Sequence, residues 1–550
     1  MNSRLMLPVI AATLLLLACN KNEPSAVTEE SVNVFSDPQI RKIYEYQDRR
    51  EGKRLIPFLK SKEPAHRERA ALAYASIRAT TFAPYLLQVA QTDETTEVRR
   101  AAVYALGQMR DSTVADDILT TFHHELDYIG KSIALEALGK CANSKALEFL
   151  LSLEFTDSVL LVGKYAGIYR ASLNKVYDKR GFQQCREVLG DDDWTGADFY
   201  AIHALFRNVR NPAAKDALDE QLARWITSNS TDKEVAHVAD MWADRITGTT
   251  PSIDGVSKGN SPYAFAAMLR EKEFSEADLD TLGRLIRNGS IAQIVRTTAA
   301  EVYIGEISKI PAEQFISTLT YCLHSGDMAL QSLSANGIAS ILKQRPDFPY
   351  EDSVDVIRQI QASLVMPQQM ETYLDLGRLI AQLEEVEFVK PEMEFNHPMD
   401  WDHVQSIRAD QQVRIETNKG TIVVKLEVNE APGSVSNFVK LVEDGFYDGK
   451  FFHRVVPNFV IQGGCPRGDG WGSLNWTQRS EFSNYLKYDR GAVGLASAGN
   501  DTEGVQFFIT HIPTPHLDGR YSIFGNVVKG MDVVDAIRIG DVINKITLVN

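Results

Sequence analysis

The sequence lacks the residue groupings that mark several common protein classes. Only five of its 550 residues are cysteine, they lie far apart, and no two form a CxxC pair. This spacing excludes a dense disulfide framework and the usual cysteine-based zinc motifs. Cys141, Cys185 and Cys322 fall in helical repetitive sequence and Cys465 lies near the end of the chain. We expect these four to be free, buried thiols.

Positive charge is also scarce. Lys and Arg number 58 against 73 Asp and Glu, so the formal net charge is −15. A nucleic-acid partner is therefore not expected, because phosphate binding requires clustered Lys and Arg. The hydrophobic content of 44% is ordinary for globular proteins. A chain of 550 residues is too long for a single core and predicts several domains.

Long apolar runs are missing except at the start of the chain. The run from Leu5 to Ala18 follows the positive Arg4. It is shorter than the ~20 apolar residues that span a bilayer and is typical of a signal-peptide core. Its end, Leu16-Leu17-Ala18-Cys19, resembles the lipobox of bacterial lipoproteins. The alternative is an ordinary signal peptide with a cysteine there by chance.

The lipobox resemblance implies that residues 1–18 are removed and that Cys19 carries the lipid. Residues 19–37 would then form a polar tether, and the lipid would hold the protein at the membrane of the bacterial cell envelope. Asn20 follows the cysteine, in place of the Asp that favours retention at the inner membrane in some bacteria. We therefore expect an anchor in the outer membrane, facing the periplasm.

Similar short segments recur after the tether. The run Arg69–Ala75 resembles Arg100–Gly107, 31 residues later, and Ala134–Gly139 resembles Ala102–Gly107, 32 residues earlier. Amphipathic stretches lie between them, so the period fits two helices per unit and predicts a helical solenoid. The segments are similar to HEAT repeats. Their alanines should allow close helix packing, and we expect their glycines to end the helices in the left-handed conformation.

Helical periodicity continues to residue 385, although the repeat becomes weaker. Residues 247–262 are rich in Gly, Ser, Thr and Pro, which predicts a loop or a break in the array. Degenerate repeats return at Val295–Tyr303 and Leu330–Ala335. We therefore expect a solenoid of HEAT-like repeats over residues 38–385 and a linker over residues 386–410.

The hydrophobic period changes from 3.6 to 2 at Gln411. Two alternating runs, Val413–Thr417 and Thr421–Lys425, flank Asn-Lys-Gly and predict a β-hairpin. Pro432–Asp444 predicts one amphipathic helix, and the remainder reads as short strands separated by glycine, typical of a closed barrel. The predicted fold class is a multidomain α plus β protein. It combines an N-terminal α-solenoid with a C-terminal closed antiparallel β-barrel over residues 411–550.

Three separated motifs occur in this C-terminal segment. Residues 451–464 read FFHRVVPNFVIQGG, residues 506–509 read QFFI and residues 516–519 read HLDG. In order and spacing these motifs resemble the cyclophilin family of peptidyl-prolyl cis/trans isomerases. The resemblance covers about residues 411–550 and implies an enzyme that isomerises X-Pro bonds.

Prolyl isomerisation has a barrier of about 18–20 kcal/mol, because conjugation gives the C–N bond double-bond character. The reaction needs no cofactor, metal or nucleophile, but it does need a hydrogen-bond donor aimed at the prolyl nitrogen. The resemblance implies that Arg454 is this donor, that Gln462 orients Arg454 and that Gln506 contacts the substrate backbone. The substrate-binding residues that it implies are Phe459, Val460, Ala496, Ser497, Phe508, His516, Leu517 and Tyr521.

Four of these positions depart from the common family pattern. Val460 stands where many relatives carry Met, Ser497 where many carry Asn, His516 where Trp is frequent and Tyr521 where His is common. The departures bear on substrate preference and on cyclosporin sensitivity more than on activity. No metal site is expected, because His511 and His516 have no third ligand of the right type nearby.

The function that we expect is prolyl isomerisation of unfolded or partly folded exported proteins. The solenoid would bind clients or a protein partner, since repeat arrays present extended surfaces. One alternative is a lipid-anchored scaffold whose barrel binds peptides with little catalysis. Another is that the solenoid belongs to a different enzyme, but residues 38–385 contain no other recognisable catalytic constellation.

Overall fold

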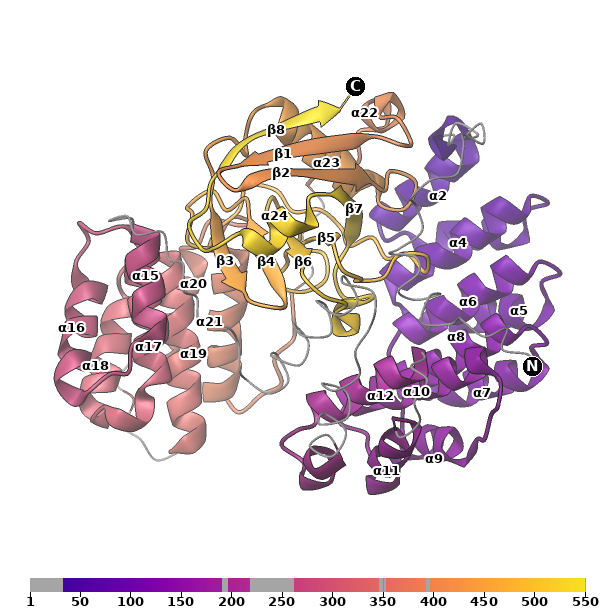
Figure 1. The fold of residues 1–550 in the computed structure, drawn as a ribbon, viewed down its shortest axis with the longest axis horizontal. Helices are drawn as coiled ribbons and strands as arrows, with labels where there is room; N and C mark the ends of the chain where they lie inside the picture. Colours follow the sequence, from indigo (N-terminus) through magenta and orange to yellow (C-terminus); the bar gives the residue numbers. More distant parts are fainter. Residues whose placement is uncertain are drawn as a thin grey trace, which may run out of the picture. The chain divides into compact units, whose positions relative to one another are not determined.

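The computed structural model describes residues 33–189, 196–217, 262–345, 350, 353–391 and 396–549 (Figure 1). The predicted signal peptide, Cys19 and most of the tether lie outside these residues, as does nearly all of the predicted break at 247–262. No helix in the described part of the chain is long and apolar enough to cross a membrane. The chain forms two compact units, and the first combines the residues before Pro251 with two later segments, Glu481–Lys487 and His516–Gly519.

The first unit contains pairs of helices that pack in sequence order. α4 packs on α6, α6 on α8, α8 on α10 and α10 on α12, while α5 and α7 lie beside α6 and α8. The helices are α2 (Pro38–Asp48), α3 (Gly52–Leu55), α4 (Pro64–Ile77), α5 (Ala83–Thr92), α6 (Thr96–Gln108), α7 (Ala115–His124), α8 (Tyr128–Lys140), α9 (Ser144–Ser152), α10 (Ser158–Leu173), α11 (Lys179–Val188) and α12 (Gly196–Arg207).

Buried ion pairs repeat along this unit with the sequence period. Arg67 Nε lies 2.7 Å from Asp93 Oδ2, and Arg99 Nε lies 2.9 Å from Glu125 Oε2. In both pairs the carboxylate comes 26 residues after the arginine. Equivalent positions of successive helix pairs therefore make equivalent bonds, as expected for a repeat array.

The repeat glycines do not end helices, which corrects the prediction made for them. Gly107 and Gly139 lie inside α6 and α8. A Cβ on Gly139 would lie 2.0 Å from the carbonyl oxygen of Gly167 in α10, so the absence of a side chain allows α8 and α10 to approach closely. The left-handed residues at the ends of α4 and α6 are instead Arg78, with φ 57°, and Arg110, with φ 54°.

The two later segments of the first unit bond to its helices. Ser76 Oγ accepts a hydrogen bond of 3.1 Å from the backbone N–H of Phe482, and the Tyr104 hydroxyl donates to the Ser483 carbonyl at 2.9 Å. A buried ion pair holds the second segment, because Arg170 Nη2 in α10 lies 3.1 Å from Asp518 Oδ2. Both of these side chains are about 95% buried.

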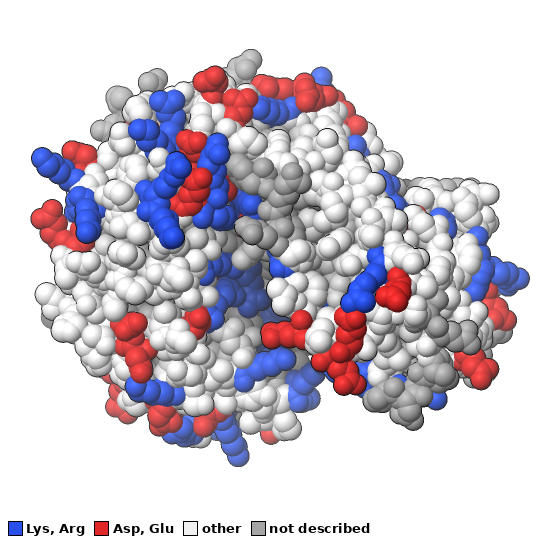
Figure 2. Space-filling view, turned by 180° about the vertical axis from the view of Figure 1, so that it is seen from behind, with Lys and Arg blue, Asp and Glu red and all other residues white. Residues whose placement is uncertain are grey.

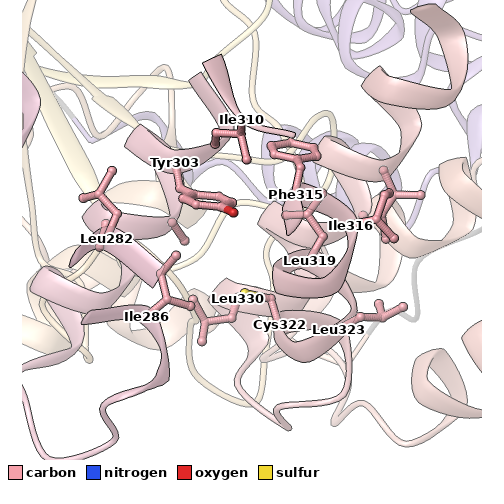
Figure 3. Packing of buried hydrophobic residues seen from close by; sticks show 14 of the residues in the cluster. Leu282, Ile286, Tyr303, Ile310, Phe315, Ile316, Leu319, Cys322, Leu323 and Leu330 are labelled. Atoms are coloured by element: carbon pink, nitrogen blue, oxygen red, sulfur yellow. The ribbon is translucent and has the colours of Figure 1, made fainter. Parts of the chain in front are cut away.

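The second unit contains a further group of helices. They are α15 (Pro262–Glu271), α16 (Glu276–Arg287), α17 (Gln293–Gly305), α18 (Ala312–Leu323), α19 (Met328–Gln344), α20 (Val354–Ala362) and α21 (Met370–Leu383). The sequence assigned these helices to one solenoid over residues 38–385, but they share a compact unit with the β-sheet. Their core includes Tyr303 and Phe315, whose rings stack with centroids 5.8 Å apart (Figure 3).

An eight-stranded sheet forms the rest of the second unit, with strand order β3-β4-β6-β5-β7-β2-β1-β8. The strands are β1 (Gln412–Thr417), β2 (Gly420–Leu426), β3 (Phe452–Val456), β4 (Val460–Gly463), β5 (Ala492–Leu495), β6 (Phe507–Thr510), β7 (Ile523–Lys529) and β8 (Ile543–Val549). The predicted β1–β2 hairpin and the predicted helix, α23 (Pro432–Glu443), are both present. α23 packs on β7 and β8, and α24 (Met531–Ala536) packs on β2.

The sheet is open, so the prediction of a closed barrel is wrong. Between the edge strands β3 and β8 the only ladder contact is the isolated bridge Phe451–Val542, just before each strand begins. Next to this bridge, the first residues of each strand bond to the turn that precedes the other strand. Phe452 bonds to the backbone of Asp541, and Ile543 to that of Lys450, so the two strands do not overlap along their lengths.

The predicted linker is partly folded. Residues 386–410 include α22 (Trp401–Ser406), which packs on α23. Val404 in this helix is fully buried and Ile407 just after it is 5% exposed. The folded region that contains the sheet therefore begins before Gln411, because α22 buries apolar side chains against it.

Charges of both signs are intermixed on the face of the molecule that Figure 2 shows. Figure 2 shows small groups of basic and acidic side chains separated by wide areas without charge. Several basic side chains are paired, such as Arg180 with Glu148 at 2.6 Å and Arg270 with Glu301 at 2.8 Å. Exposed pairs of this kind contribute little stability, about 0–1 kcal/mol each.

Candidate active site

Three predicted site residues form one row across adjacent strands of the second unit. In the antiparallel register Arg454 on β3 lies opposite Gln462 on β4, and Gln462 lies opposite Phe508 on β6. Directly opposed residues present their side chains on the same face of a sheet. The register therefore brings the predicted donor, the predicted orienting amide and a predicted pocket residue to one face.

A chain of amide hydrogen bonds leads to the arginine. Gln506 Oε1 accepts from Gln462 Nε2 at 3.0 Å, and Gln462 Oε1 lies 3.5 Å from Arg454 Nη1. Gln506 Nε2 donates to the carbonyls of Gly470 and Gly472 at 2.9 and 3.2 Å. Because both donor directions of the Gln506 amide are used, its oxygen must face Gln462. The three predicted catalytic residues are thus in contact, and the guanidinium itself is exposed.

Apolar side chains adjoin this row. Val460 and Phe508 are 2% and 5% exposed. The Phe508 ring stacks on Tyr488, with centroids 5.4 Å apart, and meets Tyr521 edge-on at 5.9 Å. Gly494, opposite Phe508 on β5, makes room for Tyr488, because a Cβ there would lie 2.1 Å from the tyrosine hydroxyl oxygen. Tyr488 was not identified from the sequence.

The other predicted substrate-binding residues lie on turns. Phe459 is half-buried in the turn between β3 and β4, which contains the left-handed residue Asn458 with φ 57°. Ala496 and Ser497 follow β5, and the Ala496 N–H donates to the Gln506 carbonyl at 2.9 Å. His516 and Leu517 lie in the short helix η6 (Pro515–Leu517) and belong to the first unit.

The histidine beside the arginine is unsuited to acid–base chemistry at neutral pH. His453 is 3% exposed. Burial and the neighbouring Arg454 charge lower its pKa to about 4, so the imidazole is neutral. Cys465 is buried as well, and burial raises the pKa of its thiol, which disfavours the nucleophilic thiolate. The remaining polar chemistry of the row is hydrogen bonding by the arginine and the two amides.

Comparison with known proteins agrees with this arrangement. Residues 412–549 match the family model described as cyclophilin type peptidyl-prolyl cis-trans isomerase/CLD. A peptidyl-prolyl cis-trans isomerase of Helicobacter pylori is 45% identical over 135 residues, which are 83% of that protein and 24% of this chain. The chain belongs to the cyclophilin family. It is a cyclophilin-type peptidyl-prolyl cis-trans isomerase.

Two other relatives show how much of the chain the family accounts for. Peptidyl-prolyl cis-trans isomerase B of Bacillus subtilis is 46% identical over 126 residues, which are 88% of that protein and 23% of this chain. An isomerase of Synechococcus elongatus is 46% identical over 140 residues, which are 96% of that protein and 25% of this chain. A second family model, HEAT repeats, matches residues 52–139. The cyclophilin region is thus a whole enzyme in these relatives, and the HEAT assignment is confirmed for the first repeats.

The role of the loop that holds Gln506 was not identified from the sequence. Gly468, Gly470 and Gly472 have positive φ values of 76°, 93° and 83°, which favour glycine. Glycine at every second position from 468 to 472 was the sequence pattern that could have indicated this loop. In the structure this conformation turns two carbonyl groups toward the Gln506 amide.

Proposed function

We propose that Arg454 is the catalytic residue and acts by donating a hydrogen bond to the prolyl nitrogen. As the amide twists, the nitrogen lone pair localises and becomes a hydrogen-bond acceptor. A guanidinium is suited to this position because it stays charged and its donors are fixed in a plane. The stabilisation is electrostatic and is largest when the donor is already oriented.

One observation carries this proposal, namely the contact of Arg454, Gln462 and Gln506 on one face of the sheet. In this proposal Gln462 orients the Arg454 guanidinium, and Gln506, besides its bond to Gln462, contacts the substrate backbone. Phe459, Val460, Phe508 and Leu517 would contact the proline ring. Ala496, Ser497, His516 and Tyr521 would border the peptide.

The test is a comparison of two arginine variants. Arg454→Ala should lower kcat/KM on an X-Pro tetrapeptide by roughly 10²–10³-fold, the scale of losing one preorganised donor. Arg414→Ala is the matched control, because Arg414 is also an exposed arginine on a strand of the same sheet. It should leave kcat/KM unchanged. A folded Arg454→Ala protein with near-normal turnover would refute the assigned role.

We further propose that the clients are unfolded or partly folded exported proteins, and that the protein is lipid-anchored at Cys19 on the periplasmic face of the outer membrane. The sequence of residues 1–20 supports the location. The HEAT-like helices would recruit clients or a protein partner, as repeat arrays commonly bind proteins.

Client recruitment is tested by comparing the full-length protein with a fragment of residues 396–550, which contains the region that makes up most of the relatives. Recruitment to a nearby active site raises the effective client concentration. The full-length protein should therefore show a higher ratio of kcat/KM on a proline-limited protein client to kcat/KM on a tetrapeptide. Equal ratios for the two proteins would count against recruitment and favour a scaffold role.

A further inference from the structure

Helices of the second unit hold the loop that orients the catalytic amides. We call residues 465–473, which follow β4, the glycine loop. The Tyr263 hydroxyl in α15 donates to the Gly468 carbonyl at 2.7 Å. Asp327, which precedes α19, accepts from Arg467 Nη2 at 3.1 Å. These bonds join the glycine loop to helices that lie more than 130 residues earlier in the chain.

A buried carboxylate connects these contacts to the turn itself. The Asp469 side chain is fully buried. Its Oδ2 lies 2.9 Å from Arg467 Nη2 and 3.1 Å from Thr297 Oγ1 in α17, and its Oδ1 accepts from the Trp471 N–H at 3.1 Å. A buried carboxylate is stable only when its oxygens are paired. Arg467 and Trp471 belong to the glycine loop itself, while Thr297 ties the buried carboxylate to α17.

The conformation of the glycine loop in turn fixes Gln506. Its amide nitrogen donates to Gly470 and Gly472, so the carbonyl positions decide where the amide oxygen points. That oxygen accepts from Gln462, which lies next to Arg454. Hydrogen bonds from α15 and from the start of α19 thus hold the backbone of the glycine loop, and further hydrogen bonds lead from this backbone through Gln506 and Gln462 to the proposed donor.

We propose that Tyr263 and Asp327 are positioning residues for the isomerase, which set the orientation of Gln506 and, through Gln462, of the Arg454 guanidinium. Neither residue belongs to the row of Arg454, Gln462 and Phe508. The inference rests on the proposed role of Arg454. It assigns α15–α19 a part in catalysis that is separate from client binding, and it explains why this helical group shares a compact unit with the sheet.

The test uses full-length protein carrying Tyr263→Phe and Asp327→Asn together. The first change removes one hydroxyl and keeps the ring that packs on Phe451. The second removes the charge that pairs with Arg467 but keeps an oxygen for the N-cap of α19, since Asn caps helices as well as Asp. Misorientation of a catalytic group by part of an ångström should lower kcat roughly tenfold. KM should change less than kcat, because Val460 and Phe508, which would contact the proline ring, are unchanged.

The matched control is Tyr303→Phe with Asp157→Asn. Tyr303 is a buried tyrosine of the same helical group whose hydroxyl lies 3.3 Å from a backbone carbonyl, and Asp157 is the N-cap of α10. Neither residue forms any of the hydrogen bonds that join the glycine loop to the helices. The control should have the kcat of the wild type, and Asp327→Glu in place of Asp327→Asn should reduce the loss of kcat to the roughly threefold expected for Tyr263→Phe alone.

A double variant that folds and turns over like the wild type would overturn this inference. The inference would also be overturned if only KM changed, or if the control lost as much kcat as the double variant. Either result would indicate a general effect on packing. Circular dichroism would show whether the double variant folds less well. In that case the single Tyr263→Phe variant tests the inference, and it should lose kcat about threefold. If Arg454→Ala also keeps its activity, the proposed function fails. If Arg454→Ala loses activity and the Tyr263 and Asp327 variants do not, only the positioning role fails.

Discussion

Lowering the pH should destabilise the unit that contains the sheet, because two of its buried residues are neutral histidines. His453 and His511 are each 3% exposed. Burial lowers the pKa of both to about 4 from an ordinary value of 6.5, with the charge of Arg454 acting on His453. Between pH 6.5 and 4 the unfolded chain therefore binds more protons than the folded chain. The free energy of unfolding is at its full value above pH 6.5 and falls as the pH is lowered toward 4.

The magnitude follows from the two pKa values. At pH 5 an unfolded histidine is almost fully protonated while the folded one remains largely neutral, which costs about 2 kcal/mol per residue. The two residues together should lower the free energy of unfolding by about 4 kcal/mol between pH 7.5 and pH 5. This is a large part of the 5–15 kcal/mol that is typical of a folded domain.

The assay is amide hydrogen exchange of the sheet strands at the two pH values, after correction for intrinsic exchange rates. The double variant His453→Gln, His511→Gln should lose most of the pH dependence, whatever its absolute stability. His124→Gln, which changes an exposed histidine of α7, should retain all of it. An equal pH dependence in the wild type and the double variant would show that these histidines are not the acid-sensitive groups.

Two further predictions concern the rest of the chain. Cys19→Ser should abolish incorporation of a fatty-acid analogue in metabolic labelling, and continued labelling would exclude the lipobox assignment. Gly139→Ala should destabilise the first unit by roughly 2 kcal/mol, because its Cβ would meet the Gly167 carbonyl. Gly305→Ala in α17, where an added Cβ would meet no atom within 4 Å beyond its chain neighbours and the backbone of its own helix, should change stability by less than about 1 kcal/mol. Similar unfolding midpoints for the two alanine variants in urea would contradict the close-packing argument.

The sequence was most informative where neighbouring residues define a structural element. The β1–β2 hairpin and α23 follow from local periodicity and turn residues, and the repeat period follows from self-similarity. The residues of the Arg454 row were found because they lie in contiguous motifs. Their geometry required the register of three strands, which these motifs do not specify.

Long-range pairing is what the sequence patterns could not show. An amphipathic helix reveals that one face is buried but not what covers it, so the patterns did not indicate that α15–α21 share a compact unit with the sheet. Gly139 carries the same local pattern whether it ends a helix or contacts a neighbouring one. The open edge between β3 and β8 depends on the turns that precede both strands. The glycine loop was not assigned a role, because its partners lie far away in the sequence.

The allocation of Glu481–Lys487 and His516–Gly519 to the first unit has a consequence for dissecting the protein. The backbone passes from one unit to the other after residues 250, 480, 487, 515 and 519. A single cut after residue 250 would therefore leave both segments on the larger fragment while their bonding partners, such as Arg170, stay on the smaller one. The two pieces should associate when co-expressed, and co-purification of one piece with the other would report on the re-formed Arg170–Asp518 pair.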